Sequence, residues 1–154
     1  MLVFLDFEAS SLGRDSYPIE VGWVFEDGAE EGWLIRPAAD WTDWAADAEA
    51  VHGITRERLV VEGEDHAVVP HRMVEVLSGH DLLASAPSWD GKWLSVLLRA
   101  AGLPRHALRL RDTEAAQVEA AMSALSAREA ALDALQLARL ALADEPVAHR
   151  AVED

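Results

Sequence analysis

The sequence has no cysteine and few basic residues. Without cysteine there is no disulfide, no thiolate metal site and no cysteine nucleophile, which excludes zinc ribbons and thiol proteases. Lysine and arginine total 13 against 28 aspartates and glutamates, so the formal net charge is −15. Such a balance argues against a protein that holds nucleic acid through a general basic surface. Any polyanionic substrate therefore needs a local source of positive charge.

Long apolar runs are also missing. No stretch approaches the roughly 20 apolar residues that span a bilayer, and the N-terminus lacks the basic region of a signal peptide. We therefore expect a cytoplasmic protein with no membrane partner. The chain does have a hydrophobic fraction of 51% and six tryptophans, which exclude a disordered acidic tail. Its 154 residues are typical of one domain, which we predict to be 1–154.

Three consecutive strands are predicted at the start of the chain. Leu2–Phe7 is a short apolar run that ends in a turn, and Ile19–Phe25 and Gly32–Ile35 are the next two. The pair Asp27-Gly28 is a hairpin signal between the second and the third. We therefore expect an antiparallel meander.

Helices and strands alternate in the rest of the chain. Helices are expected over 40–51, from an N-cap at Thr55, over 67–77, from an N-cap at Ser88 to Ala101, over 113–143 in two pieces, and from near Val147. Two further strands are expected at Asp81–Ala86 and Leu108–Asp112. The pattern predicts an α/β fold, with a mixed five-stranded sheet and helices on both faces.

Two carboxylates, Asp6 and Glu8, stand at the end of the first predicted strand. Side chains alternate along a strand, so residues 6 and 8 lie on the same face. Two adjacent carboxylates repel each other, and burying them is costly unless a cation neutralises them. Oxygen ligands favour the hard ions Mg²⁺ or Mn²⁺. The pair therefore predicts a metal site.

Three segments, in order, resemble the motifs of the DEDDh 3′→5′ exonucleases, which include proofreading exonucleases, ribonuclease T and oligoribonuclease. The first motif is similar to residues 4–12, the second to Asp90 with the apolar helix face that follows it, and the third to His149 with Asp154 five residues later. The resemblance covers nearly the whole chain. It implies a ribonuclease-H-like fold.

The resemblance also implies the chemistry of the site. Asp6, Glu8, Asp90 and Asp154 match the residues that hold two Mg²⁺ or Mn²⁺ ions in that family, and His149 matches the general base. The implied reaction releases nucleoside 5′-monophosphates from the 3′ ends of single-stranded DNA or RNA, or from short oligonucleotides. The bound cations would supply the positive charge that the acidic surface lacks.

The end of the first motif and the loop 51–55 resemble family elements at the nucleotide pocket, and Trp89 stands next to Asp90. The residues expected to contact the terminal nucleotide are Ala9, Ser10, Leu12, His52 and Trp89.

The sequence departs from the family at three places. Ala9-Ser10-Ser11 stands where the family frequently has Thr-Thr-Gly. Ala86-Pro87-Ser88-Trp89 precedes Asp90, where the family commonly has Asn, small residues and Phe. The chain ends at Asp154, whereas family members continue this helix by several turns. We therefore expect a single exonuclease domain that is truncated in its C-terminal helix.

Other functions stay open at this point. A haloacid-dehalogenase-like phosphatase also has an acidic pair after its first strand, but it needs Asp where this chain has Glu8. An HD-type phosphohydrolase would use His80-Asp81, but that dipeptide precedes a predicted strand and not a helix. A nuclease fold that has lost catalysis and serves as a binding module is a third alternative. The sequence does not choose DNA from RNA or a monomer from a homodimer.

Overall fold

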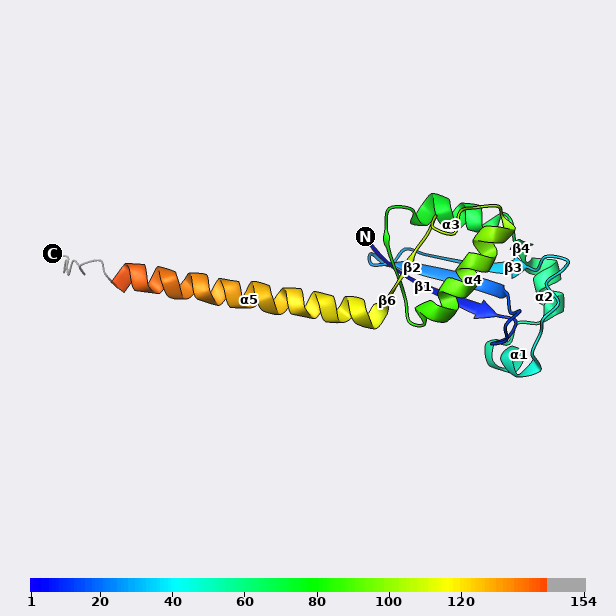
Figure 1. Cartoon of the computed structure of the whole chain (residues 1–154), viewed down its shortest axis with the longest axis horizontal. Helices are drawn as coiled ribbons and strands as arrows, with labels where there is room; N and C mark the ends of the chain where they lie inside the picture. Colours follow the sequence, from blue (N-terminus) through cyan, green and yellow to red (C-terminus); the bar gives the residue numbers. More distant parts are fainter. Residues whose placement is uncertain (144–154) are drawn as a thin grey trace, which may run out of the picture. The chain divides into compact units, whose positions relative to one another are not determined.

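The computed structural model describes residues 1–143 (Figure 1). Backbone contacts divide the chain into two units, Met1–Ala116 and the part from Gln117 onward. Each unit is described by itself below. The prediction of a single domain over 1–154 stays a prediction.

The first unit is built on a mixed sheet. Its strands are β1 (Leu2–Ala9), β2 (Pro18–Phe25), β3 (Glu30–Arg36), β4 (Glu64–Asp65), β5 (Asp81–Ala84) and β6 (Leu110–Asp112). They are ordered β4-β3-β2-β1-β5-β6, with the pairs β1–β2 and β2–β3 antiparallel and the other neighbours parallel. The predicted meander and mixed α/β class are confirmed. The sheet has six strands and not five, because two residues pair with the end of β3, too few to leave a pattern in the sequence.

Four helices belong to the first unit, and a fifth begins in it. They are α1 (Ala46–His52), α2 (Arg56–Glu62), α3 (Val69–Leu77), α4 (Pro87–Ala100) and α5 (Thr113–Ala143). The predicted N-cap at Thr55 is confirmed, since its hydroxyl accepts a hydrogen bond from the Arg58 amide at 3.2 Å. Pro70 lies in the first turn of α3, where its missing N–H costs nothing.

Three predicted helix boundaries are wrong. Residues 40–45 are not helical, because the Ala45 amide donates to the Ser10 carbonyl and ties this segment to the β1–β2 loop. Ser88 is not the N-cap of α4, since Ala86 occupies that position and Pro87 begins the helix. The helix over 113–143 is one continuous piece, because this segment is rich in alanine, leucine and glutamate and contains no glycine or proline to interrupt it.

The core lies on one face of the sheet. Val3, Leu5 and Phe7 of β1 are buried, and they pack with side chains from α3 and α4. The helix residues in this core are Val69, Met73, Leu77, Trp93, Leu94, Leu97 and Leu98. Phe4 and Asp6 alternate with the buried residues and are exposed. The helices α3 and α4 therefore cover one face of β1. They leave open the opposite face, which carries Asp6 and Glu8.

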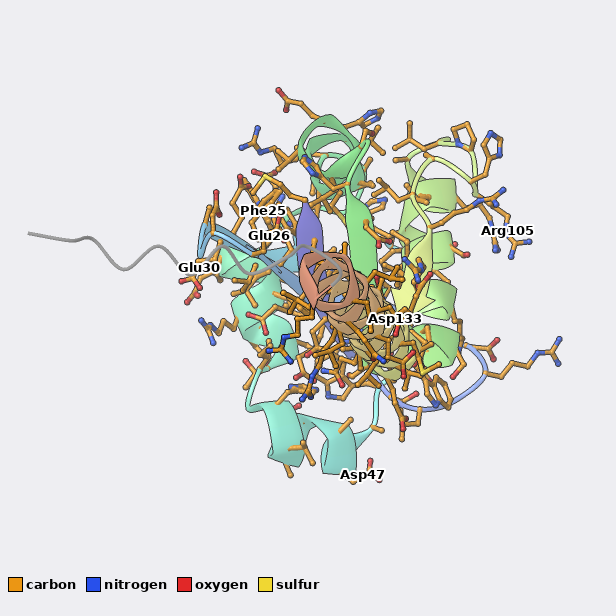
Figure 2. All side chains as sticks on the ribbon, turned by 90° about the vertical axis from the view of Figure 1, so that its left-hand side faces the viewer. Phe25, Glu26, Glu30, Asp47, Arg105 and Asp133 are labelled. Atoms are coloured by element: carbon orange, nitrogen blue, oxygen red, sulfur yellow. The ribbon has the colours of Figure 1, made fainter. Side chains whose placement is uncertain are left out.

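The part of the second unit that the structure describes belongs to α5. Side chains project from this helix all around its axis (Figure 2), and all the residues from Gln117 to Ala141 are exposed. No helix within residues 1–143 combines the length and the apolar character needed to cross a bilayer.

Candidate active site

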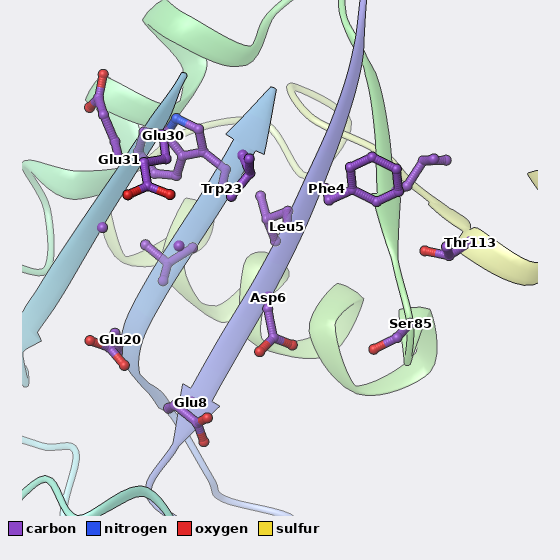
Figure 3. A pocket seen from close by; sticks show the side chains of 15 residues that line it. Phe4, Leu5, Asp6, Glu8, Glu20, Trp23, Glu30, Glu31, Ser85 and Thr113 are labelled. Atoms are coloured by element: carbon purple, nitrogen blue, oxygen red, sulfur yellow. The ribbon is translucent and has the colours of Figure 1, made fainter. Parts of the chain in front are cut away.

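The two carboxylates of β1 lie on one face of the central strand, as predicted. In the antiparallel ladder, Asp6 faces Gly22 and Glu8 faces Glu20. Figure 3 shows the side chains of Asp6, Glu8 and Glu20 on the same side of the sheet. The register shifts between Glu8 and Ala9, so a bulge lies just before the last pair of the ladder, Ala9 with Pro18. Three acidic side chains therefore gather where β1 leads into its loop.

A row of glycines continues across the sheet from Asp6. Gly22 of β2 faces Gly32 of β3, so neither neighbouring strand has a side chain in this row. The backbone does not demand glycine here, because a Cβ at Gly22 would come no closer than 3.9 Å to another residue and one at Gly32 would meet nothing within 4 Å. The row leaves the sheet surface bare, which is typical of a place where another group approaches closely.

The bare row forms part of an open cleft of about 730 Å³ (Figure 3). That volume is within the range of small-molecule and nucleotide sites. Asp6, Glu8, Glu20, Glu30 and Glu31 line it as acidic groups, and Ser85 and Thr113 add hydroxyls.

Asp90 is the third carboxylate of the predicted set, and it is 2% exposed. It lies in the first turn of α4, and its Oδ2 accepts a hydrogen bond from the Ala86 amide at 3.3 Å. The pKa of Asp90 is raised to about 6, mainly by burial and also by repulsion from Asp6 and Glu8, while hydrogen bonds from the amides of Ala86 and Phe7 oppose the rise. The amide of Phe7 lies between Asp6 and Glu8, so Asp90 belongs to the same cluster.

Glu8 has a raised pKa for the same reasons. Partial burial is the largest cause, repulsion from Asp6 adds to it, and the electrostatic effect of His52 lowers it. Glu20, directly opposite on β2, also raises it. Asp6, Glu8, Asp90 and Glu20 are thus coupled by repulsion that a divalent cation would relieve.

The donor chemistry of this cluster fits Mg²⁺ or Mn²⁺, because these ions prefer carboxylate oxygens. Within residues 1–143, however, no group of three or more histidines and acidic residues is arranged to hold a metal ion. His149 and Asp154, which the resemblance adds to the set, lie outside the described residues. The metal roles of all five residues stay predictions.

Of the predicted nucleotide-contacting residues, Ala9, Ser10 and Leu12 lie at the end of β1 and in the loop that follows it. Ala9 and Ser10 are buried, and the Ser10 hydroxyl is engaged by Asp43 and the Tyr17 amide, so their side chains face the protein. Leu12, at 70% exposed, projects from the loop into solvent.

His52 is held in a defined orientation at the end of α1. Its Nδ1 accepts a hydrogen bond from the Ile54 amide at 3.0 Å, and Gly53 between them has φ +70°, a left-handed conformation that favours glycine. The neutral ring therefore carries its proton on Nε2. This buried nitrogen has no hydrogen-bond partner among the residues described.

Trp89 precedes Asp90 and is 36% exposed. Its ring stacks on that of Trp93 with the centroids 5.6 Å apart, and the Lys92 ammonium lies 5.2 Å from its centroid. The stack gives a partly exposed aromatic surface beside the carboxylate cluster.

Sequence reasoning missed Glu20, Asp43 and Lys92. Glu20 was visible as an acidic residue in the second strand, but its place opposite Glu8 depends on the strand register. Lys92 is the only lysine in the chain, and this was the one available signal. Its contacts join residues 79 positions apart, a distance at which no local pattern operates.

No protein-family model matches the chain, and no curated protein sequence does. Solved structures of exonuclease I do match its fold. Exonuclease I from Methylocaldum szegediense matches with a TM-score of 0.64 and 17% identity, over 72% of this chain and 27% of that one. Escherichia coli exonuclease I in complex with a dT13 oligonucleotide matches with a TM-score of 0.61 and 16% identity, over 72% and 27%.

A zinc-bound complex of the Escherichia coli enzyme with single-stranded DNA matches with a TM-score of 0.62 and 16% identity, over 72% of this chain and 27% of that one. At these identities the likeness establishes a shared fold, which confirms the ribonuclease-H-like prediction. The chain spans less than a third of the length of these proteins.

Proposed function

We propose that this protein is a metal-dependent 3′→5′ exonuclease that acts on single-stranded nucleic acid. The observation that carries the proposal is the coupled cluster of Asp6, Glu8 and Asp90 beside an open cleft. Carboxylates with raised pKa values at a cleft are typical of functional sites. The fold shared with exonuclease I supports the same reading.

Asp6, Glu8 and Asp90, together with Asp154, would hold two Mg²⁺ or Mn²⁺ ions. Such ions supply a hydroxide nucleophile, neutralise the scissile phosphate and stabilise the departing 3′-oxygen. His149 would accept the proton of the attacking water, a task suited to an imidazole near neutral pH.

His52 would have a separate part. Its fixed tautomer places at Nε2 an N–H that has no partner among residues 1–143, and the ring lies close enough to Glu8 to act on it electrostatically. It would donate a hydrogen bond to an oxygen of the terminal nucleotide. It would not serve as a base, because the Ile54 amide already occupies the lone pair of Nδ1.

The acidic surface restricts the substrate. Glu20, Glu30 and Glu31 line the same cleft, and the net charge of −15 repels long polyanions. We therefore expect short single strands to be better substrates than long ones. Whether the sugar is ribose or deoxyribose depends on a contact to the 2′-hydroxyl.

A nuclease fold used only for binding is the second candidate. One observation favours it: no three-ligand group is arranged for a metal within residues 1–143. Metal-dependent turnover separates the two candidates.

The test uses single-stranded DNA and RNA oligonucleotides with a 5′ label, incubated with the full chain and Mg²⁺. We expect a ladder that shortens from the 3′ end, and no ladder in EDTA or with a 3′-phosphate block. Asp6→Asn should abolish the ladder, whereas Asp47→Asn, which removes one exposed carboxylate from α1, should not. Internal cuts, or full activity in EDTA, would contradict the proposal.

A further inference from the structure

The loop that connects β1 to β2 carries Leu12 at its exposed tip, and its base is closed by its own hydrogen bonds. The Ser10 amide donates to the Tyr17 carbonyl at 3.0 Å, and the Tyr17 amide donates to the Ser10 hydroxyl at 3.1 Å. Ser10 and Tyr17 are 0% and 1% exposed. The base of the loop is therefore part of the folded interior, directly after Glu8 and Ala9.

Asp43 holds the first half of the loop. Its Oδ2 accepts hydrogen bonds from the hydroxyls of Ser10 at 2.9 Å and Ser11 at 2.5 Å. The Ser11 hydroxyl in turn accepts from the Gly13 amide at 2.9 Å. The Ala45 amide adds a bond to the Ser10 carbonyl. One carboxylate thus organises the loop from Ser10 to Gly13.

Lys92 of α4 holds the second half. Its ammonium donates to the Gly13 carbonyl at 2.6 Å and to the Ser16 hydroxyl at 2.8 Å. The Trp93 indole N–H also donates to the Ser16 hydroxyl, at 3.0 Å. The third contact of the ammonium is the ring of Trp89. Lys92 therefore connects the loop to the helix that carries Asp90.

Asp43 and Lys92 together bond to polar groups in both halves of the loop. The ammonium has three N–H groups, and two carbonyl or hydroxyl acceptors and an aromatic ring lie against it. Leu12, Arg14 and Asp15 remain exposed on the loop, and Leu12 is the apolar side chain among them. The ammonium of the single lysine in this acidic chain thus contacts the protein's own loop and the Trp89 ring. These contacts occupy the groups with which it could otherwise bind a phosphate.

We propose that Lys92 and Asp43 are positioning residues, which hold the loop between Ser10 and Ser16 as a rigid wall for the terminal nucleotide of a single strand. The inference rests on the proposed function. It assigns Lys92 to substrate placement through the loop, with no contact to the phosphate backbone and no part in metal binding.

The experiment compares Lys92→Met, which keeps the aliphatic stem, with Lys92→Arg and with Arg99→Met. Arg99→Met is the matched control, because it removes one positive charge from an exposed position on the same helix. Binding of a labelled oligothymidylate is measured by fluorescence anisotropy in Ca²⁺ at several salt concentrations. Amide hydrogen exchange of Gly13 and Ser16 reports the order of the loop.

We expect Lys92→Met to raise the Kd about tenfold, as for the loss of hydrogen bonds from a charged group, and to speed exchange of the loop amides. The salt dependence of Kd and the Mg²⁺-induced rise in Tm should not change. Lys92→Arg should restore most of the affinity, and Arg99→Met should match the parent. Asp43→Asn, which weakens the loop from its other side, should act in the same direction and tests the inference if Lys92→Met does not fold.

An unchanged Kd, or unchanged exchange, would overturn the inference. A salt dependence lowered by about one charge would do so too, because it would make Lys92 a phosphate contact. A parent that binds the oligonucleotide but does not cleave it in Mg²⁺ would end the proposed function, and Lys92 would still be judged by its Kd. A parent that binds no single strand would overturn both.

Discussion

Replacing Asp90 by asparagine removes a carboxylate that is 2% exposed and repelled by Asp6 and Glu8. Asparagine keeps the shape of the protonated acid but cannot ionise. The variant therefore isolates the free energy that the native state loses when Asp90 becomes charged. Its effect should depend on pH in a way that a change in packing would not.

The raised pKa of Asp90 sets the size of the effect. The pKa of Asp90 rises from 3.8 to about 6 on folding, so the native state retains a proton that the unfolded chain releases. Below the lower value both states are protonated, and the carboxyl costs nothing. As pH rises toward 6 the unfolded state is favoured increasingly, and the full loss is about 3 kcal/mol. About 2 kcal/mol of it falls between pH 4.5 and 7.5.

Urea unfolding in EDTA at several pH values measures this loss. The free energy of unfolding of Asp90→Asn minus that of the parent should increase by about 2 kcal/mol from pH 4.5 to 7.5. The lost hydrogen bond from Ala86 lowers the whole curve of the variant but not its slope. Mg²⁺ should reduce or reverse the pH dependence of the parent, because the ion favours ionised carboxylates. A difference that does not change with pH would refute the coupling of Asp90 to the cluster.

Three further predictions concern the site and the fold. Asp6→Asn should remove most of the rise in Tm that Mg²⁺ or Mn²⁺ gives the parent, as measured by thermal denaturation with and without the ion; an equal rise in both proteins would mean that Asp6 is not a ligand. His149→Ala should lower turnover by about 10²–10⁴-fold while the Mg²⁺-induced Tm shift remains, and an unchanged rate would exclude His149 as the base. Leu97→Ala, at a position 0% exposed in the core, should cost about 2–5 kcal/mol in urea unfolding, and a loss below about 1 kcal/mol would contradict the packing of α4 on the sheet.

The shared face of Asp6 and Glu8 could be predicted because alternation along a strand depends only on local geometry. Asp90 was also predicted in the first turn of a helix, from an N-cap at Ser88, and it does lie in the first turn of α4 although that helix begins at Pro87. Both predictions used neighbouring residues alone. For the same reason the Thr55 cap was predictable, since its partner is three residues away.

The rest of the site depends on contacts between distant residues. Glu20 lies opposite Glu8 only because the β1–β2 loop has its particular length and the strands pair with a bulge. Residues 40–45 were expected to be helical, but Asp43 and the Ala45 amide bond to the loop instead. Tertiary hydrogen bonds here outweigh helix propensity, which is worth less than about 1 kcal/mol per residue.

The most direct test of the central claim is the identity of the product released from a single strand. The full chain is incubated with Mg²⁺ and a short oligonucleotide, and the products are identified by mass. The account predicts nucleoside 5′-monophosphates released one at a time from the 3′ end, and a loss of this release in Glu8→Gln. Nucleotides with a 3′-phosphate, or the same release from Glu8→Gln as from the parent, would contradict it.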